Sequence, residues 1–396
     1  MNIDRSTWRP VRFGEVVKQA GNTTQGPVDG RAVGLEHLDS DALTVSRFAP
    51  GDADHMFTRS FRKGQVLYGK RRAYQRKGAR VDFDGVCSND IIVMEPASGM
   101  LHPALLPILV QSPSFVEYAI ATSVGSLSPR TSWKSLSAYS FGLPPLDEQE
   151  RIGELVWAAE EVAVKSEAAV EAAWVVEKRV LEDAYADPAW PVVRVRDAGQ
   201  VQLGRMQHPK YQTGQYSRPY LRVANVHDDR LELDDVLEMD FGGKHYAKYS
   251  LQPGDVLLNE GQSTEFVGRC ALYQGEIEGC CYQKSLLRFR AGESTRTEFA
   301  YGWFRRAYYR GDFARKSTKT TSLANLTAVR FSEMDFPLPD LDVQDEVVRR
   351  VAEAREARRA LEEHAGASRR LVRGLINRIF SEDIPPDELQ RGEQRS

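Results

Sequence analysis

The pattern of apolar and polar positions predicts two long helices, each opened by the same short signal. LPPLDEQE begins at Leu143 and LPDLDVQD at Leu338. Roughly 35 residues with a helical apolar spacing follow each motif. Proline is tolerated at the start of a helix and acidic residues favour its first turn, so each motif indicates a helix N-terminus. Asp147 and Asp342 are the expected N-caps.

Apolar side chains then recur in the rhythm of a seam that packs against a partner helix. In the first helix the expected seam includes Ser166 and comprises Ile152, Leu155, Ala159, Val162, Ala169, Ala173, Val176 and Val180. In the second it is interrupted by Arg358 and Ser368 and comprises Val347, Val351, Ala354, Leu361, Ala365, Val372, Leu375 and Ile379. The simplest interpretation is an antiparallel two-helix rod, roughly 55 Å long at about 1.5 Å per residue. The alternative is that each helix packs on its own globule.

Three anchors show that the chain contains the same unit twice. WRPVRFGEVV at Trp8 aligns with WPVVRVRDAG at Trp190, GQVL at Gly64 aligns with GDVL at Gly254, and the helix-start motifs align last. The offset grows in that order through 182, 190 and 195 residues. Chance explains any one match but is a poor account of three in sequence.

Each copy is expected to be a mixed α/β domain followed by one long helix. Residues 13–20 are predicted as a short helix, while Val66–Tyr68, Asp90–Met94 and their counterparts Val256–Leu258 and Ser285–Phe289 are predicted as strands. Helices are expected in SPSFVEYAIAT and TEFAYGWFRRAYYRGDFARK. The predicted fold is thus two tandem, pseudo-symmetric α/β domains separated by an antiparallel coiled coil. The expected boundaries are 1–146, 147–187 (first helix), 188–341, 342–381 (second helix) and 382–396 (flexible tail).

Bulk composition narrows the class of protein. The chain is 41% hydrophobic, has a net charge of −3 and contains no apolar stretch that matches a signal peptide or a membrane span. We therefore expect a cytoplasmic protein without membrane contact. The four cysteines (Cys87, Cys270, Cys280 and Cys281) lack the spacing of zinc ligands and are better interpreted as buried or indifferent thiols.

The charges are sorted by region. Residues 147–187 carry 12 acidic and 4 basic residues, whereas residues 59–80 carry nine basic residues and no acid. Residues 301–330 carry seven basic residues opposed only by Asp312. Two basic segments in separate copies favour a polyanion bound at two places, although a solvated face would also explain each one.

The sequence also resembles the specificity subunits of type I restriction-modification systems. The resemblance covers nearly the whole chain and lies in the duplication, in LPPLDEQERI and LPDLDVQDEV, and in two further blocks. These are VLYGKRRAYQRKGARVDFDGVCSNDIIVMEP and GDVLLNEGQSTEFVGRCALYQGEIEG, which look like stretches common in the recognition domains of that family.

The resemblance implies a non-catalytic reader of double-stranded DNA that recognises an asymmetric bipartite site. It implies two methyltransferase subunits and a restriction/translocase subunit as partners. S-adenosylmethionine, Mg²⁺ and ATP are then expected in those partners, and no cofactor or metal in this chain. The sequence agrees, since it contains no Asn/Asp-Pro-Pro-aromatic methylation motif, no phosphate-binding GxxxxGK[ST] loop and no convincing nuclease cluster.

Candidate DNA contacts are cations and base-reading polar side chains near strand ends. In the first copy they are Lys70, Arg71, Arg72, Tyr74, Arg76 and Lys77, followed by Arg62 and Lys63. In the second copy the base-reading candidates are Asn259, Glu260, Gln262 and Ser263. The phosphate-binding candidates there are Arg305, Arg306, Arg310, Arg315, Lys316 and Lys319, unless that helix turns its aromatic side chains inward and its arginines to solvent.

Other segments leave alternatives open. The loops SLSPRTSW and STKTTSLANL correspond by position and are expected to contact phosphate or a methyltransferase, or to be structural turns. Trp157 and Trp174 fall outside the expected seam, so they are candidates for a partner interface or for packing on their own domain. Two rival functions remain: a coiled-coil scaffold that binds RNA or acidic protein, and an enzyme with an unrecognised active site.

Overall fold

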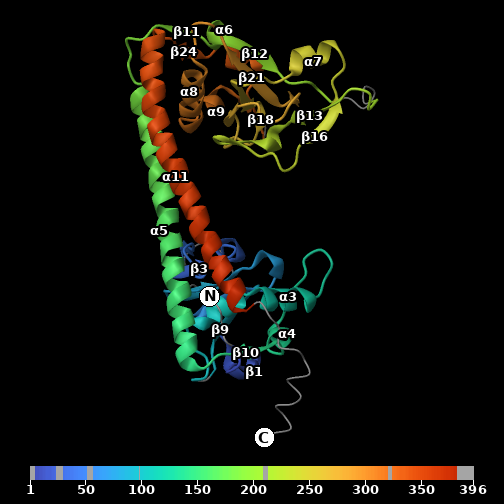
Figure 1. The fold of residues 1–396 in the computed structure, drawn as a ribbon, viewed down its shortest axis with the longest axis vertical. Coiled ribbons are helices and arrows are strands. Elements are labelled where there is room, and N and C mark those ends of the chain that lie inside the picture. Colours follow the sequence, from blue (N-terminus) through green and yellow to red (C-terminus); the bar gives the residue numbers. More distant parts are fainter. Residues whose placement is uncertain are drawn as a thin grey trace. The chain divides into compact units, whose positions relative to one another are not determined.

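The computed structural model describes residues 5–23, 30–50, 57–97, 99–207, 213–319 and 323–380. The chain divides into two compact units, and the division falls inside the two long helices (Figure 1). Unit 1 comprises residues 1–168 and 362–396, and unit 2 comprises residues 169–361. The tail expected at 382–396 lies outside the described residues.

Unit 1 is built on two four-stranded sheets. The antiparallel central sheet has the order β2 (Val17–Ala20), β9 (Ile91–Pro96), β6 (Val66–Gly69), β7 (Gly78–Arg80). The other sheet has the order β4 (Ala49–Pro50), β3 (Arg31–Val33), β8 (Gly85–Cys87), β5 (Arg59–Phe61), with β3 and β8 parallel. The remaining elements are β1 (Arg9–Arg12), paired with β10 (Ser140–Leu143), and α1 (Phe13–Val16), η1 (Leu35–His37), η2 (Ala73–Gln75), α2 (Leu105–Val110), α3 (Pro113–Ala121) and α4 (Trp133–Leu136).

Unit 2 repeats this plan. Its antiparallel central sheet has the order β12 (Gly199–Leu203), β21 (Leu286–Ala291), β17 (Asp255–Asn259), β19 (Cys270–Tyr273). A second sheet has the order β16 (Leu237–Asp240), β13 (Ser217–Leu221), β20 (Cys281–Tyr282), again with one parallel pair. The remaining strands are β11 (Val192–Arg194), β14 (Val226–His227), β15 (Arg230–Leu231), β18 (Gly261–Gln262), β22 (Thr318–Lys319), β23 (Ala324–Asn325) and β24 (Asp335–Pro337). The short helices are α6 (Val195–Ala198), η4 (Val223–Asn225), α7 (Lys244–Tyr249), α8 (Thr297–Tyr309), α9 (Asp312–Lys316) and α10 (Ala328–Ser332).

The matching strand orders confirm the predicted duplication and the mixed α/β class. The four predicted strands correspond to β6, β9, β17 and β21, and the helices predicted late in each copy correspond to α3, α8 and α9. The helix predicted for residues 13–20 was half wrong. One helical turn ends at Val16, and Val17–Ala20 forms β2, because these residues pair with β9 across the central sheet. Tertiary pairing overrides a weak local preference there.

Helices α5 (Leu146–Ala184) and α11 (Leu341–Ile379) each contribute to both units. In unit 1 the core joins Val156 of α5 and Val372 of α11 to the central sheet. In unit 2 the core joins Leu181 of α5 and Val351 of α11 to the corresponding sheet. The first half of α5 thus lies with the second half of α11, and the reverse holds in unit 2, so the two helices run antiparallel.

The buried face of α11 is the one expected from the sequence, with Val347, Val351, Ala365, Val372 and Ile379 buried. For α5 the expected seam was partly wrong. Ile152 and Ser166 of the expected seam are buried, but the side chains of Leu155, Val162 and Val176 are exposed. Residues outside that seam are buried as well, among them Val156, Glu160, Ala163, Glu177 and Leu181. Two of these are glutamates, and each is buried because it meets an arginine of α11, at Arg369 and Arg358.

A buried glutamine explains why both helix-start motifs contain one. The Gln149 side chain donates to the carbonyls of Pro144 (2.8 Å) and Met100 (2.9 Å), and accepts from the His102 amide (2.8 Å). Gln344 repeats all three hydrogen bonds, to Pro339, Ser294 and Arg296, at the same distances. The N-cap prediction was wrong, because the helices begin at Leu146 and Leu341 and therefore place Asp147 and Asp342 inside the first turn.

Candidate nucleic-acid interface

In unit 1 the basic segment after β6 is joined to the loop between α3 and α4. Arg71 and Arg130 form an antiparallel backbone bridge. The Arg72 amide donates to the Pro129 carbonyl (3.0 Å), and the Thr131 amide donates to the Lys70 carbonyl (2.9 Å). We call residues 70–77 and 123–131 the first loop pair. The backbone thus brings together two segments that the sequence marked separately.

The first loop pair presents cations around a single carboxylate. Asp90 forms an ion pair with Arg71 (Nε to Oδ2, 2.7 Å) and accepts a hydrogen bond from Arg130 (Nη2 to Oδ1, 2.8 Å). Lys70 donates to the Asn89 carbonyl (2.6 Å), and burial, together with Arg59, lowers the pKa of this lysine. One carboxylate therefore holds two guanidinium groups in place without cancelling the positive charge of the surface.

Arg72 and Tyr74 are the exposed members of the predicted contacts in the first loop pair. Arg72 has a left-handed backbone (φ 54°) that turns the chain into η2, and its side chain is exposed. Tyr74 is 57% exposed within the same turn. Both side chains are free to meet a ligand that approaches the first loop pair.

Four other predicted contacts in this copy are placed differently. Arg76 is paired with Asp41 (2.8 Å) and donates to the Gln111 carbonyl, and Lys77 donates to the Leu35 carbonyl (2.7 Å). These two cations hold neighbouring loops of unit 1, which favours a structural role for them over DNA contact. Arg62 and Lys63 are exposed at the opposite end of β6 from the first loop pair.

Unit 2 builds the same junction from different residues. Strand β18, just after β17, pairs with β23, which pairs in turn with β22. The Leu326 amide donates to the Glu260 carbonyl (2.8 Å), as Thr131 does to Lys70 in unit 1. We call residues 260–263, 317–319 and 323–326 the second loop pair. It unites GQS after β17 with the described part of the STKTTSLAN loop.

The two loop pairs differ in the sign of charge at equivalent positions. The Lys70 amide donates to the Asp90 carbonyl (2.8 Å), and the Glu260 amide donates to the Ser285 carbonyl (2.9 Å). A lysine in unit 1 is therefore replaced by a glutamate in unit 2. Glu260 is 5% exposed, and burial raises the pKa of its carboxyl while Lys284 opposes that rise.

The other predicted base readers of unit 2 separate into two groups. Asn259 is fully buried and its amide donates to the Val226 carbonyl (3.3 Å), so its assignment as a DNA contact is corrected to a structural one. Gln262 and Ser263 are half-buried at the start of the second loop pair. They remain placed to meet a ligand.

The arginines of α8 are neutralised by acids of α5, which sequence reasoning missed. Arg305 is 1% exposed and pairs with Glu177, and Arg306 is paired with Glu182 (3.0 Å). Arg310 shares Glu182 at 3.2 Å. The assignment of Arg305 and Arg306 as phosphate contacts is therefore wrong, and Arg310 is already engaged. The reason is that the basic stripe of α8 faces the acidic helix α5 within unit 2.

Cations remain exposed at the edge of the second loop pair. Lys316 and Lys319 are exposed, and Arg315 is exposed although it pairs with Asp312. Arg330, which the site prediction did not include, donates to the Lys316 carbonyl (2.8 Å). Sequence reasoning also missed Arg130 in unit 1, which lies in the loop before α4 and is matched in unit 2 by Asn325.

A buried ion cluster in unit 2 joins the domain to both long helices. Glu177 of α5 meets Arg305 and Arg358, and Arg358 also pairs with Asp229. Burial alone would raise the pKa of Asp229, but Arg305 and Arg355 lower it to about 2. Unit 1 places Asp41 at the corresponding position, where it meets Arg76 and Arg373 at 2.8 Å each.

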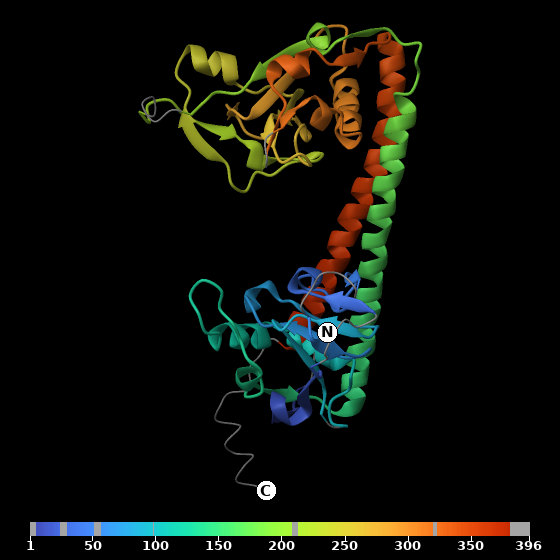
Figure 2. The ribbon, with the colours of Figure 1, turned by 180° about the vertical axis from the view of Figure 1, so that it is seen from behind.

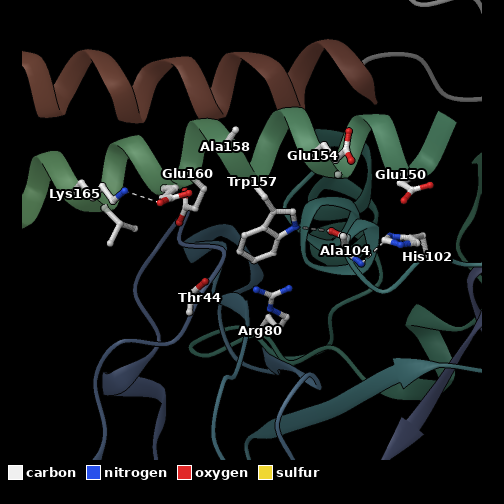
Figure 3. Close-up of a pocket in the computed structure, with 13 residues that line it drawn as sticks. Thr44, Arg80, His102, Ala104, Glu150, Glu154, Trp157, Ala158, Glu160 and Lys165 are labelled. Carbon is white, nitrogen blue, oxygen red and sulfur yellow. Dashed lines mark hydrogen bonds and ion pairs between the residues drawn. The ribbon is translucent and has the colours of Figure 1, made fainter. Parts of the chain in front are cut away.

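Trp157 and Trp174 both pack against their own unit. The Trp157 indole donates to the Ala104 carbonyl (3.0 Å), and the Arg80 guanidinium lies 3.9 Å from its ring centroid (Figure 3). Trp174 lies under Arg358 at 4.0 Å and meets Tyr309 edge-on. Trp157 also borders a cavity of about 800 Å³, whose lining includes Thr44, Arg80, Glu150, Glu154, Glu161 and Val164.

No cluster of three or more metal-ligating side chains occurs in the part of the chain that the structure describes. Within the same residues, no helix is long and apolar enough to cross a membrane. All four cysteines are buried and free, and burial raises the pKa of Cys87, Cys280 and Cys281 to about 12.

No family model matches the chain, but individual proteins do. A putative type I restriction enzyme MjaX specificity subunit of Methanocaldococcus jannaschii is 18% identical over 168 residues, which cover 42% of this chain and 40% of that protein. The type I restriction enzyme EcoDI specificity subunit of Escherichia coli is 28% identical over 123 residues, covering 31% of this chain and 24% of that one. The chain thus spans less than half the length of these curated relatives.

Solved structures match over nearly the whole chain. A chain from a study of complex assembly and conformational transition in the type I R-M system aligns with a TM-score of 0.58 and 21% identity, covering 94% of this chain and 97% of that one. The S subunit of a type I restriction-modification system from M. genitalium aligns with a TM-score of 0.55 and 10% identity, covering 97% and 99%. At these identities the likeness establishes the fold. The matches confirm the resemblance and the fold class expected from the sequence.

Proposed function

We propose that this chain, which resembles type I specificity subunits in sequence and in fold, is the DNA-recognition subunit of a type I restriction-modification complex. It recognises an asymmetric bipartite site on double-stranded DNA and positions methyltransferase and restriction subunits there. The observation that supports this most strongly is the pair of equivalent loop junctions with different side chains. Two matching junctions that carry different side chains suit two different half-sites.

In unit 1 we assign DNA contact to Lys70, Arg71, Arg72 and Tyr74, joined by Arg130. Arginine forks read guanine edges or clamp phosphate, and lysine acts as a point charge on phosphate. In unit 2 we assign base reading to Gln262 and Ser263, whose amide and hydroxyl groups can hydrogen-bond base edges, whereas Glu260 is 5% exposed and is excluded on the same ground as Asn259. Phosphate contact there falls to Arg315, Lys316, Lys319 and Arg330.

We assign the methyltransferase contact to the cavity beside Trp157, while Trp174 is a weaker candidate because it lies within the ion cluster of unit 2. The exposed acids Glu150, Glu154 and Glu161 surround an apolar wall that includes Val164. This combination suits a partner segment with apolar and basic side chains. In this proposal catalysis, S-adenosylmethionine, Mg²⁺ and ATP belong to the partner subunits, and the protein acts in the cytoplasm.

The test is methylated-base sequencing of host DNA with and without this gene, in the presence of the methyltransferase subunits. The proposal expects one bipartite adenine motif to disappear when the gene is removed. An unchanged methylome, together with no duplex binding by the chain and its methyltransferase partner, would favour the coiled-coil scaffold for RNA or acidic protein. Methylation by the purified chain alone would instead favour an enzyme.

A further inference from the structure

The loop between α3 and α4 holds two apolar side chains in solvent beside the cations of the first loop pair. Leu127 is 94% exposed and Val124 is 79% exposed, and Leu127 exceeds every other large apolar side chain of the described residues. Figure 2 shows this loop, in teal, projecting from unit 1, and Figure 1 shows the same projection from the other side.

The base of this loop is fixed by backbone hydrogen bonds. Val124 and Arg130 exchange two of them, both 2.9 Å long, and the Pro129 carbonyl accepts from Arg72 at 3.0 Å. Gly125 has a φ of +113°, a backbone conformation that glycine adopts without strain, and it starts the tip. The fixed base therefore presents the tip, Gly125–Ser128, in a defined position.

The surroundings of the tip favour duplex DNA over another occupant. Residues 122–136 contain Arg130 and Lys134 and no acid, and residues 59–80 contain nine basic residues and no acid. Single exposed leucines are common on soluble proteins. An apolar tip whose base is joined to Arg71, Arg72 and Arg130 is different, because duplex DNA offers both a phosphate backbone for the cations and an apolar base stack for the leucine. Proteins that bend DNA use leucine and similar side chains in this way.

We propose that Leu127 is a wedge that inserts between base pairs next to the half-site read by unit 1, and that Val124 covers the edge of the opened step. This inference rests on the proposed function and extends it, because recognition then includes the ease with which one base step unstacks. Such readout selects sequences at positions that no hydrogen-bonding side chain touches.

The test compares Leu127→Ser and Leu127→Phe with Val192→Ala, which removes an exposed apolar side chain from β11 of unit 2. Each full-length variant is bound, with its methyltransferase partner, to duplexes carrying 2-aminopurine at successive positions that flank the mapped half-site, away from the methylated adenine, which the methyltransferase flips out. In the unaltered complex we expect fluorescence to rise at one step. Leu127→Ser should abolish that rise and weaken binding about tenfold with an unchanged salt slope, since no phosphate contact is lost. Leu127→Phe and Val192→Ala should both retain the rise.

The outcomes separate this inference from the proposed function. Unchanged affinity and unchanged fluorescence in Leu127→Ser, with sequence-specific binding intact, would overturn the wedge alone. Loss of methyltransferase association in Leu127→Ser would also overturn it, by making the tip a protein contact. Failure of the unaltered complex to bind duplex DNA would overturn the wedge and the proposed function together.

Discussion

The two loop pairs share a backbone arrangement and differ in chemistry. In each unit the residue after the central strand donates its amide to one segment and accepts from the other, with distances that agree within 0.1 Å. That residue is Lys70 in unit 1 and Glu260 in unit 2. The duplicated backbone therefore fixes where a side chain is presented, and the side chain fixes what it can recognise.

The two units also differ in the elements that carry the exposed cations. In unit 1 most of these cations directly follow β6. In unit 2 they lie in α9, β22 and α10, in or beside the segments that pair with the residues after β17. The arginines of α8 are instead used for packing against α5. The two copies of the fold therefore carry their exposed positive charge on different elements. This difference is expected if each copy contacts its own half-site through the same kind of loop junction.

The largest difference between the units concerns the ions buried against the long helices. Arg358→Ala in unit 2 removes a buried arginine that Glu177 and Asp229 share, leaving Glu177 only Arg305, and we expect a loss of about 3–5 kcal/mol in the free energy of unfolding. Arg369→Ala in unit 1 should cost about 1.5–3 kcal/mol, because the Arg369 side chain is 19% exposed against 3% for Arg358. Urea unfolding of the two variants measures both, and equal losses would contradict the comparison.

At the helix-start glutamines, by contrast, we expect the two units to respond equally. Gln149→Ala and Gln344→Ala each remove three hydrogen bonds of matching length and leave buried carbonyls unsatisfied. We expect each to cost about 1–3 kcal/mol, and the two costs to agree. Hydrogen exchange at the first turns of α5 and α11 gives the local readout. A loss confined to one copy would show that the two helix starts are not equivalent.

Acid should weaken unit 2 through Asp229. Its pKa lies near 2 in the folded protein, below the ordinary value of 3.8, so the folded state binds fewer protons there than the unfolded state. The stabilisation of the folded state by ionised Asp229 is present above about pH 4 and is lost as the pH falls toward 2. Asp229→Asn should flatten the stability curve over that window, as measured by thermal unfolding at successive pH values. If stability changed with pH equally in Asp229→Asn and in the unaltered protein, the lowered pKa of Asp229 would be refuted.

The smallest expected effect concerns phosphate contact in unit 2. Lys319→Ala should weaken DNA binding only a few-fold and uniformly across sequences, while the slope of log affinity against log salt falls by about 0.9. Lys77→Ala is the matched control in unit 1, because its ammonium is already held by the Leu35 carbonyl. Titrations from low to moderate salt measure both slopes. A change of methylation motif in Lys319→Ala would reassign that lysine to base reading.

Local sequence patterns predicted the strands, the long helices and the duplication, because apolar spacing and turn residues act over a few positions. They did not predict that Arg305 is buried in an ion pair, because its partner Glu177 lies 128 residues earlier in the chain. The seam of α5 failed for the same reason. The expected seam contained no glutamate, but arginines of α11 allow Glu160 and Glu177 to be buried there.

The candidate site shows the same limit. Lys70, Arg71 and Arg72 are visible in sequence as a basic run, but Arg130 joins them only because two loops some 60 residues apart pair through their backbones. Asn259 has the chemistry of a base reader, and only its complete burial in β17 removes it from the site. Residue type suggests chemistry, while access is decided by tertiary packing.

The most direct test of the account changes one loop pair at a time and sequences the methylated bases. Arg71→Ala with Arg72→Ala should alter or relax one half of the bipartite motif and leave the other half unchanged. Gln262→Ala with Ser263→Ala should do the same to the opposite half. A uniform loss of methylation across the whole motif in both variants, or a change of the same half in both, would contradict the claim that each loop pair reads its own half-site.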